Sequence, residues 1–575
     1  METLVNGKQT VTKTETMTGA EALIRSLLAE GVETIFGYPG GAIMPIYDAL
    51  YNYKDQLNHI LVRHEQGATH AAQGFARVRN EVGVVFATSG PGATNLITGI
   101  ADAQIDSTPM VCITGQVASN LLGTDAFQET DVIGISMPVT KWNHQITDAS
   151  EIPEIIAKAF YIARSGRPGP VVIDITKDAQ FASLEYKYQK CTEIRTYHPV
   201  PKIKKDKLKE AAALINGAKQ PFLLIGQGVL ISQAQEVLRK FIEKAHIPSA
   251  WTILGLSALD NEHPLNVGML GMHGNYAPNV LTNECDVLIA VGMRFDDRVT
   301  GDLSRYARQA KVIHIEIDPS EIDKNVKADV PVIGDARQVL EALMPLINEN
   351  DHSSWLERFK QLHQIELDKI ITHDLYPKTE GVRMGEVVRH ISEATKGEAI
   401  IVTDVGQHQM VTSRYYKFRL PHSNITSGGL GTMGFALPAA MGAKVGRPDR
   451  PVVAVIGDGG FQMTIQELGT IFQYDIPVKI VILNNSFLGM VRQWQQLFFD
   501  RRYSFTEMKN PDFTAIAKGF SIESKKVTKR EELEQGVKEM MLHPGAYLLE
   551  VTVEKEENVF PMVPSGAAIS DIRME

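Results

Sequence analysis

Short apolar runs that end in glycine or in a polar residue recur along this chain and alternate with amphipathic stretches. In "PVVAVIGDGG" (451–460) an unbroken apolar run leads directly into Gly457, Asp458 and Gly459. A strand that is apolar on both faces and ends in a glycine turn before a helix is typical of a parallel sheet covered by helices. The sequence therefore predicts an α/β protein built from doubly wound parallel sheets.

Two interruptions of this alternation divide the chain into three predicted domains. The first block contains "GVVFATSGPG" and "GPVVIDIT" and ends in the polar, proline-bearing stretch 185–207. The second block contains "PFLLIGQG", "DVLIAVGMRF" and "KVIHIEID" and ends near the charged stretch 353–374, and the third begins near Gly381. We expect domains over residues 1–187, 188–375 and 376–575.

The first and third blocks share an internal repeat. Residues 82–116 and 450–485 both run as a strand, a glycine turn, a helix, a short turn with proline and a second strand. The helix of each copy begins just after the glycines, so its free N–H groups face the carboxyl edge of the sheet, where such folds bind ligands. Only the later copy carries an acidic residue there, Asp458, and we therefore expect a metal site in the third domain alone.

Charge and cysteine content argue against several classes of protein. The formal net charge is −10, and no stripe of lysine and arginine marks a nucleic-acid surface; we interpret the densest basic run (202–209) as a solvated linker and helix start. Cys112, Cys191 and Cys285 lie far apart, which argues against a disulfide framework or a zinc site and predicts a reducing compartment, the cytoplasm. No apolar run reaches the roughly 20 residues that span a bilayer, and residues 1–23 have neither the pattern of a signal peptide nor that of a transit peptide.

Asp458 and Asn485 each follow an apolar strand of one strand–helix–strand unit. Neighbouring strand ends of a parallel sheet lie about 5 Å apart, so both side-chain oxygens can face one ion. A carboxylate, an amide oxygen and a backbone carbonyl suit Mg²⁺, which keeps water ligands and bridges to phosphates. The alternative interpretation is a capping aspartate at a helix start, with Asn484 and Asn485 in a turn.

The residues at 457–459 and 484–485 together resemble the motif of thiamine diphosphate enzymes, which opens with GDG and closes with NN. The resemblance implies that Asp458, Asn485 and the backbone of Phe487 hold Mg²⁺, and that Mg²⁺ holds the diphosphate of the cofactor. The carboxylate at the end of the buried strand would then be balanced by a cation.

Glu65 in "RHEQGA" precedes a helix of small residues in the first block. Taken alone, an acid at a helix start is more often a partner of the helix dipole. In thiamine enzymes a glutamate hydrogen-bonds N1′ of the aminopyrimidine and so helps that ring to remove the C2 proton of the thiazolium; the resemblance implies this role for Glu65. That role needs a carboxyl group able to share a proton, whereas Asp458 must stay ionised beside the cation. The first and third domains are expected to grip the cofactor together, across a dimer.

Further stretches extend the resemblance from about Gly19 to Ile572. "FGYPGG", "TSGPGATN", "GTDAFQET", "MRFDDRVTG", "SGGLGTMGFALPAAMGA" and "NNSFLGMVRQWQ" are similar to the catalytic large subunits of the acetohydroxyacid synthase (acetolactate synthase) family. The resemblance implies that pyruvate is decarboxylated on thiamine diphosphate and that the hydroxyethyl carbanion adds to pyruvate, giving 2-acetolactate, or to 2-oxobutyrate, giving 2-aceto-2-hydroxybutyrate. This is the first common step of branched-chain amino-acid biosynthesis. A homodimer or homotetramer with active sites at the subunit interface, and a small regulatory subunit, are also implied.

The same resemblance assigns roles to residues that are ambiguous by themselves. It places in contact with thiamine diphosphate Gln407, His408, Gly431, Thr432, Met433, Gly459, Gly460 and Met490. Met433 is implied to lie under the bend between the thiamine rings, although a methionine there is otherwise a pliable core residue. It assigns to catalysis and substrate binding Gln128, Lys177, Arg298 and Trp494.

Each of these last residues also has an ordinary interpretation. Lys177 and Arg298 would otherwise be surface ion-pair partners, and Trp494 a core or interface residue. Within the resemblance, Gln128 and Lys177 lie near cofactor and substrate, the forked donors of Arg298 suit a 2-oxo acid carboxylate, and Trp494 narrows the acceptor pocket.

The middle block carries no full GxGxxG pattern, so its residues alone give only a weak dinucleotide signal. The resemblance nevertheless implies that FAD binds this domain without a redox role in the net reaction. The positions it assigns to FAD are Arg167, Gly226, Gly228, Met272, His273, Gly292, Arg294, Asp296, Glu316, Ile317 and Asp335. The alternatives are a nicotinamide dehydrogenase, a non-enzymatic ligand-binding scaffold, and the sister thiamine enzymes pyruvate oxidase, glyoxylate carboligase and flavin-free acetolactate synthase.

Overall fold

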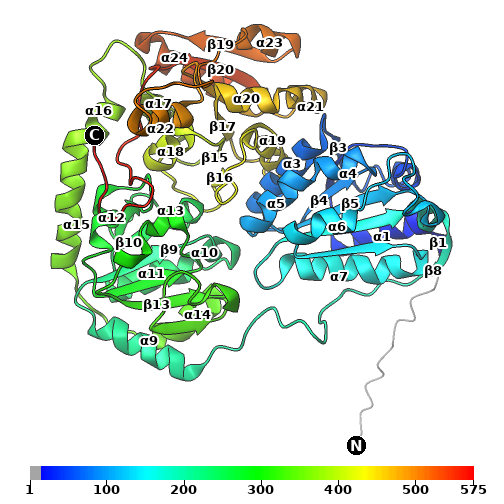
Figure 1. Ribbon diagram of the computed structural model, residues 1–575, viewed down its shortest axis with the longest axis horizontal. Coiled ribbons are helices and arrows are strands. Elements are labelled where there is room, and N and C mark those ends of the chain that lie inside the picture. Colours follow the sequence, from blue (N-terminus) through cyan, green and yellow to red (C-terminus); the bar gives the residue numbers. More distant parts are fainter. Residues whose placement is uncertain (1–14) are drawn as a thin grey trace, which may run out of the picture. The chain divides into compact units, whose positions relative to one another are not determined.

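The computed structural model describes residues 15–575, which form two compact units (Figure 1). The first unit contains the residues up to Thr69, Val82–Arg164 and Pro168–Tyr197, and the second contains His70–Glu81, Ser165–Arg167 and His198–Glu575. The prediction about a leader peptide falls mainly on residues 1–14, which lie outside the described residues. Within 15–575, no helix combines the length and the apolar character needed to cross a membrane.

A six-stranded parallel sheet forms the core of the first unit. Its order is β3(Asn58–Leu61)-β2(Thr34–Gly37)-β4(Gly83–Ala87)-β5(Met110–Gln116)-β7(Pro170–Thr176)-β6(Trp142–Ile146). β4, β5 and β7 are buried along their whole length, as their apolar runs predict. The helices of this part are α1(Gly19–Glu30), α2(Met44–Tyr51), α4(Pro91–Asn95), α5(Ile97–Ile105), α6(Val132–Ser136), α7(Ile152–Arg164) and α8(Lys177–Phe181), and α3(Glu65–Arg79) begins here. An antiparallel pair, β1(Glu15–Thr18) and β8(Ser183–Tyr186), completes the unit.

The second unit contains two further parallel sheets. The central one has the order β11(Asn266–Met269)-β10(Ser249–Trp251)-β9(Pro221–Ile225)-β12(Val287–Val291)-β13(Lys311–Glu316)-β14(Val330–Ile333). Counted along the chain from β9, this is the order 3-2-1-4-5-6 of dinucleotide-binding folds. In such sheets the strand order reverses beside the first strand, and ligands bind in the crevice at that point. Here the crevice lies between β9 and β12.

Helices cover both faces of the central sheet. Leu223 and Ile225 of β9 belong to the core formed with α9(Lys205–Gly217), α11(Gln235–Ala245) and α14(Ala336–Leu343). The alternate residues Phe222 and Leu224 belong to a second core, formed with α12(Tyr276–Leu281) and α15(Ser353–Glu366). Successive side chains of a strand point to opposite faces, so a strand that is apolar throughout requires this double cover.

The third sheet repeats the topology of the first. Its order is β16(Asn424–Thr426)-β15(Ile400–Thr403)-β17(Val452–Gly457)-β18(Lys479–Asn484)-β20(Tyr547–Thr552)-β19(Glu523–Val527). Counted along the chain, both sheets have the order 2-1-3-4-6-5, which agrees with the repeat seen in the sequence. The helices around this sheet are α17(Met384–Thr395), α18(Gln407–Tyr415), α19(Ala436–Gly446), α20(Asp458–Met463), α21(Leu468–Gln473), α22(Gly489–Phe498), α23(Phe513–Gly519) and α24(Leu533–Leu542).

The predicted fold class, three doubly wound parallel sheets, is confirmed. Every strand predicted from an unbroken apolar run is present, whereas β1, β6, β8, β10, β11, β14, β16 and β19 were not predicted. These strands lie at or next to a sheet edge, and most of them are short or only partly buried. The boundaries at 187/188 and 375/376 stay predictions. All three cysteines are free thiols.

A buried ion pair within the second unit joins α15, which packs on the central sheet, to α18, a helix of the third sheet. Arg414 of α18 donates to the Glu366 carboxylate at 2.5 Å, and both side chains are at most 1% exposed. Glu366 also accepts from Asn275 Nδ2 at 3.0 Å and from the backbone N–H of Tyr276 at 2.7 Å, and Arg414 donates to the carbonyl of Gly274 at 2.8 Å. The pair therefore fixes a loop of the central domain to a helix of the third.

We predict that Glu366→Ala lowers the free energy of unfolding by about 3–5 kcal/mol, because it leaves Arg414 charged and buried without its partner. Glu341→Ala is the matched control: it breaks the pair with Arg337, in which both side chains are 53% exposed, and is expected to cost well under about 1 kcal/mol. Denaturant unfolding monitored by tryptophan fluorescence compares the two. Equal small losses would show that the buried pair contributes little.

Candidate functional site

The carboxyl edge of the third sheet brings the predicted metal ligands together. β17 ends at Gly457 and β18 at Asn484, and these neighbouring strands pair Gly457 with Leu483. Asp458 is the first residue of α20, and Asn485 directly follows β18. Because the two strands are parallel and adjacent, both side chains originate from the same edge of the sheet.

Asp458 is only 1% exposed, and its Oδ2 accepts a hydrogen bond from Asn510 Nδ2 at 2.6 Å. Burial raises the pKa of the Asp458 carboxyl to about 6, and the hydrogen bond from Asn510 opposes that shift. A cation beside the carboxylate favours its ionised form, so the position suits a metal ligand better than an isolated buried acid.

Asn485 lies in a buried amide cluster with Gln407. Asn485 Nδ2 donates to Gln407 Oε1 at 3.4 Å, and Gln407 Nε2 donates to Gln493 Oε1 at 2.8 Å and to the carbonyl of Glu557 at 2.7 Å. Gly489 leaves room for this contact, because a Cβ at that residue would lie 2.2 Å from Gln407 Oε1. Asn485 and Gln407, which lie far apart in the sequence, are therefore held by one hydrogen-bond network.

His408 packs against the same strand end. A Cβ on Gly457 would lie 2.9 Å from its ring, and burial lowers the pKa of His408 to about 4, so the imidazole is neutral at pH 7. Its Nε2 is buried and has no hydrogen-bond partner among residues 15–575. A buried polar atom without a partner is costly, so this nitrogen fits a polar ligand such as a diphosphate.

The turn at 431–436 places Met433 beside Gly459. A Cβ on Gly459 would lie 3.7 Å from the Met433 methyl group. Asp404, which follows β15, holds this turn by accepting the backbone N–H groups of Gly434 and Ala436, both at 3.0 Å. Burial raises the pKa of Asp404 to about 6, and these N–H groups oppose the shift. Asp404 was not predicted from the sequence, because the two backbone N–H groups that it accepts lie about 30 residues away and no local sequence pattern marks it.

The predicted residues of the first unit gather around the turn that follows β4. Glu65 begins α3 and is 9% exposed, and its Oε2 accepts from Asn95 Nδ2 at 2.9 Å. A Cβ on Gly92 would lie 3.3 Å from Glu65 Oε1, and a Cβ on Gly90 would lie 2.7 Å from the carbonyl of Gln128. Gln128 itself has a φ of +61°, a conformation that non-glycine residues rarely adopt. Glu65 and Gln128 therefore share one site.

Other predicted positions lie at separate places in the fold. Lys177 begins α8 after β7, and Gly431 and Thr432 lie on the loop between β16 and α19. Phe487 lies on the loop after β18, and Met490 lies in the first turn of α22. Trp494 lies on α22, with its ring centroid 5.0 Å from that of Phe498.

Arg298 lies at a pocket of the second unit. It sits on α13(Asp297–Thr300), its side chain is 62% exposed, and its guanidinium contacts the sulfur of Met272 at 3.2 Å. Both residues line the pocket together with Val563, Pro564 and Gly566 of the C-terminal segment. Asp297 also lines the pocket and lies 3.5 Å from the Arg298 Nε through its Oδ2, so the pocket combines an exposed ion pair with an apolar wall.

The crevice between β9 and β12 contains three of the predicted flavin positions. Gly226 donates to the carbonyl of Val291, and Gly228 to that of Gly292, each at 2.9 Å. Gly292 has a φ of +59°, and a Cβ there would lie 2.7 Å from the Gly228 Cα. The backbones approach so closely that only glycine fits, as at the tight glycine turns of dinucleotide-binding folds.

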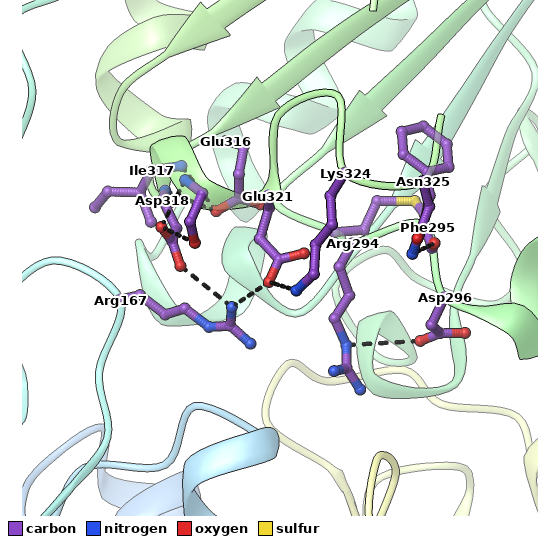
Figure 2. Close-up of polar contacts among 12 residues, drawn as sticks. Arg167, Arg294, Phe295, Asp296, Glu316, Ile317, Asp318, Glu321, Lys324 and Asn325 are labelled. Atoms are coloured by element: carbon purple, nitrogen blue, oxygen red, sulfur yellow. Dashed lines mark hydrogen bonds and ion pairs between the residues drawn. The ribbon is translucent and has the colours of Figure 1, made fainter. Parts of the chain in front are cut away.

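The loop after β13 adds charged side chains beside this crevice (Figure 2). Glu316 accepts the N–H groups of Ile317 and Asp318, and burial raises its pKa to about 7. Arg167 donates to Asp318 at 3.3 Å and to Glu321 at 2.8 Å.

The remaining predicted flavin positions complete this region. Arg294 faces Asp296, whose carboxylate caps α13, with 3.6 Å between Nε and Oδ2, and Asp335 caps α14. His273 is buried, and its Nδ1 has no hydrogen-bond partner in the part of the chain that is described. The charged side chains and the unpaired imidazole nitrogen of this region therefore fit a nucleotide cofactor.

Three domain families match successive parts of this chain. They are the thiamine pyrophosphate enzyme N-terminal TPP-binding domain (residues 17–135), central domain (208–343) and C-terminal TPP-binding domain (404–551). Each matched stretch contains most of one six-stranded sheet.

Curated relatives extend the similarity to nearly the whole chain. The probable acetolactate synthase large subunit of Methanocaldococcus jannaschii is 46% identical over 97% of this chain and 95% of its own length. The acetolactate synthase isozyme 2 large subunit of Escherichia coli is 45% identical over 97% of this chain and 99% of its own. The acetolactate synthase large subunit of Corynebacterium glutamicum is 44% identical over 97% and 90%. This chain therefore belongs to the acetolactate synthase large subunits, and its activity is that of a thiamine diphosphate-dependent acetohydroxyacid synthase.

Proposed function

We propose that Asp458, Asn485 and the backbone carbonyl of Phe487 hold Mg²⁺ and through it the diphosphate of thiamine diphosphate, with Gln407 and His408 as further contacts. The observation that carries this assignment is the buried Nε2 of His408, which has no hydrogen-bond partner among residues 15–575, while the Nδ1–Cε1 edge of the same ring packs against Gly457, the residue before Asp458. Oxygen ligands of this kind are those that Mg²⁺ prefers.

Glu65 is proposed to act on the aminopyrimidine. When bound, thiamine diphosphate supplies an electron sink for cleaving and forming carbon–carbon bonds next to a carbonyl. Glu65 shares a proton with N1′, and Asn95 orients its carboxyl by donating to Oε2, which leaves Oε1 directed at the Gly90–Gly92 turn. Met433, held by the turn that Asp404 fixes, sets the conformation of the cofactor.

Substrate residues are proposed from the same geometry. The fork of Arg298 binds the carboxylate of a 2-oxo acid at the pocket it shares with Met272, and Gln128 and Lys177 act near cofactor and substrate. Pyruvate serves as donor, and pyruvate or 2-oxobutyrate as acceptor. Trp494 narrows the acceptor pocket and so favours 2-oxobutyrate.

FAD is proposed to bind the β9–β12 crevice through the glycines at 226, 228 and 292, His273 and the loop after β13. Support comes from the strand order of the central sheet and from the close backbone approach of those glycines. The relatives are named large subunits, so a small regulatory subunit is the proposed partner. The chain is also proposed to assemble as a homodimer or homotetramer. The proposed compartment is the cytoplasm.

The roles of the two acids can be separated by substitution. Purified protein with pyruvate, Mg²⁺, thiamine diphosphate and FAD is expected to form 2-acetolactate, and leaving out any one cofactor is expected to lower the rate. Glu65→Gln should lower the rate by about 10²–10⁴-fold, because a proton-sharing carboxyl is lost, with thiamine diphosphate still bound. Asp458→Ala should instead lose affinity for cofactor and metal, measured by quenching of tryptophan fluorescence. Equal losses of affinity in both variants would contradict this division.

Acceptor choice tests the role of Trp494. Trp494→Leu is expected to keep turnover of pyruvate alone and to lower the preference for 2-oxobutyrate by about tenfold or more, since the pocket that discriminates one methylene is widened. Competition between the two acceptors, with both products quantified, measures this ratio. Phe498→Leu, which changes the neighbouring ring on the same helix, should leave the ratio unchanged. An unaltered ratio in Trp494→Leu would refute the assignment.

Burial of Glu316 predicts a pH-dependent stability. Its pKa is raised from 4.5 to about 7 in the folded chain, so the protonated form is favoured and the contribution to stability is lost as pH rises from 4.5 through 7. Glu316→Gln is therefore expected to raise the melting temperature relative to the parent at pH 8 but not at pH 4.5. The corresponding gain in the free energy of unfolding at pH 8 is at most about 3 kcal/mol.

A neighbouring carboxylate supplies a control of opposite sign. Burial acts to raise the pKa of Glu321, but Lys324 and Arg167 lower it overall. Glu321→Gln should therefore destabilise the chain above pH 4.5. Thermal unfolding of flavin-free protein across this pH range measures both variants. A Glu316→Gln effect independent of pH would contradict the raised pKa.

A further inference from the structure

A continuous series of hydrogen bonds links the metal-site carboxylate to a buried acid two strands away. Asn510 Nδ2 donates to Asp458 Oδ2 at 2.6 Å and to Asn484 Oδ1 at 2.9 Å. Asn484 Nδ2 in turn donates to Glu550 Oε1 at 2.8 Å. Glu550 lies on β20, which pairs with β18, so the series runs across neighbouring strands to the β17 edge.

The direction of these bonds is fixed by Glu550 together with the backbone N–H of Ser486, which donates to Asn484 Oδ1 at 3.1 Å. Lys526 Nζ lies 2.8 Å from Glu550 Oε1, and a carboxylate paired with an ammonium group can only accept. The amide of Asn484 must therefore turn its NH₂ group toward Glu550 and its oxygen toward Asn510. Asn510 must then present its own NH₂ group, and this group also reaches Asp458.

An independent contact fixes the same orientation from the other side. Gln462 Nε2 donates to Asn510 Oδ1 at 3.0 Å and also to the backbone carbonyl of Asp458 at 3.1 Å. The amide of Asn510 is thus held between a donor on one side and two acceptors on the other. Asp458 receives a donor and never faces the oxygen of Asn510.

Glu550 is an expensive residue at its position. It is fully buried, and its neighbours on β20 are the apolar residues Leu548, Leu549 and Val551. Its Oε2 has no hydrogen-bond partner among residues 15–575. A half-satisfied carboxylate in an apolar sheet costs stability, so packing alone does not account for it.

We propose that Glu550 is a positioning residue for the metal site: through Asn484 and Asn510 it orients the Asp458 carboxylate toward a divalent cation. This inference rests on the proposed role of Asp458 as metal ligand. Groups outside the first coordination sphere fix the orientation of ligating side chains, and their loss typically costs about 10–100-fold in metal affinity. Asn510 is the member that touches the ligand directly.

Glu550→Gln tests the direction of the bonds with little change in shape. A glutamine carries no charge and can present either its oxygen or its NH₂ group to Asn484, so the orientation of Asn484 then depends on the backbone N–H of Ser486 alone and Asn510 is held less firmly against Asp458. Binding of Mn²⁺ to the full-length protein with saturating thiamine diphosphate, followed by the electron paramagnetic resonance of free Mn²⁺, should weaken about tenfold or more. Asn510→Ala should weaken it to a similar degree.

Two controls separate positioning from a general loss of structure. Lys525→Met removes the neighbouring ion pair with Glu539, whose side chains are 32% and 40% exposed, without touching Glu550, and Mn²⁺ affinity should stay within about twofold of the parent protein. In Glu550→Gln, the Mg²⁺ concentration for half-maximal rate should rise about tenfold, with kcat at saturating Mg²⁺ largely retained. A merely structural defect would lower kcat and the melting temperature together.

Asp458→Ala separates the proposed metal site from the proposed positioning role of Glu550. If Asp458→Ala binds Mn²⁺ like the parent protein, the proposed metal site is wrong and the inference fails with it. If Asp458→Ala loses Mn²⁺ while Glu550→Gln and Asn510→Ala bind it within twofold of the parent, the metal site stands and the positioning role is overturned. Should Glu550→Gln not fold, Asn510→Ala alone decides, because it removes the last link at a half-buried position.

Discussion

The structure depends on one costly placement, a carboxylate at the buried end of an apolar strand. Asp458 is almost completely buried, and desolvation alone would favour its neutral form. The surroundings compensate with hydrogen-bond donors and with a neighbouring strand end that carries amides. A parallel sheet makes this possible because it brings the ends of successive strands, separated by a whole helix in the chain, to one edge.

The three six-stranded sheets differ in strand order or in the residues of their turns, and these differences suit them to different roles. The first and third share one strand order, yet only the third has an acid where the first has Ser89 and Gly90. The first contributes Glu65 and the strained Gln128 beside that glycine turn instead. The central sheet has the order of dinucleotide-binding folds, although its sequence lacks the full glycine pattern. Topology here carries a signal that short motifs do not.

Features that depend on residues close together in the chain could be predicted from the sequence, whereas features that depend on distant residues could not. Strands such as β5, β17 and β18 are apolar throughout, and their periodicity and glycine ends are local properties. β16 and β19 lie at a sheet edge, where a short or half-polar segment pairs only because its neighbour is already in place. Asp458 and Asn485 were found because each follows a recognisable strand. Asn510 and Glu550 were not, because their partners lie 26 to 66 residues away in the chain.

The Glu366–Arg414 pair bears on how such proteins exchange parts during evolution. Arg414 lies on the helix that begins with Gln407 and His408, and it grips the loop that carries His273 and Gly274. A transplanted central domain without a counterpart of Glu366 would leave the guanidinium of Arg414 buried and unpaired. Chimeras of this fold should therefore fold only when Glu366 and Arg414 are exchanged together. In this respect the two domains behave as one evolutionary unit, although each has its own sheet.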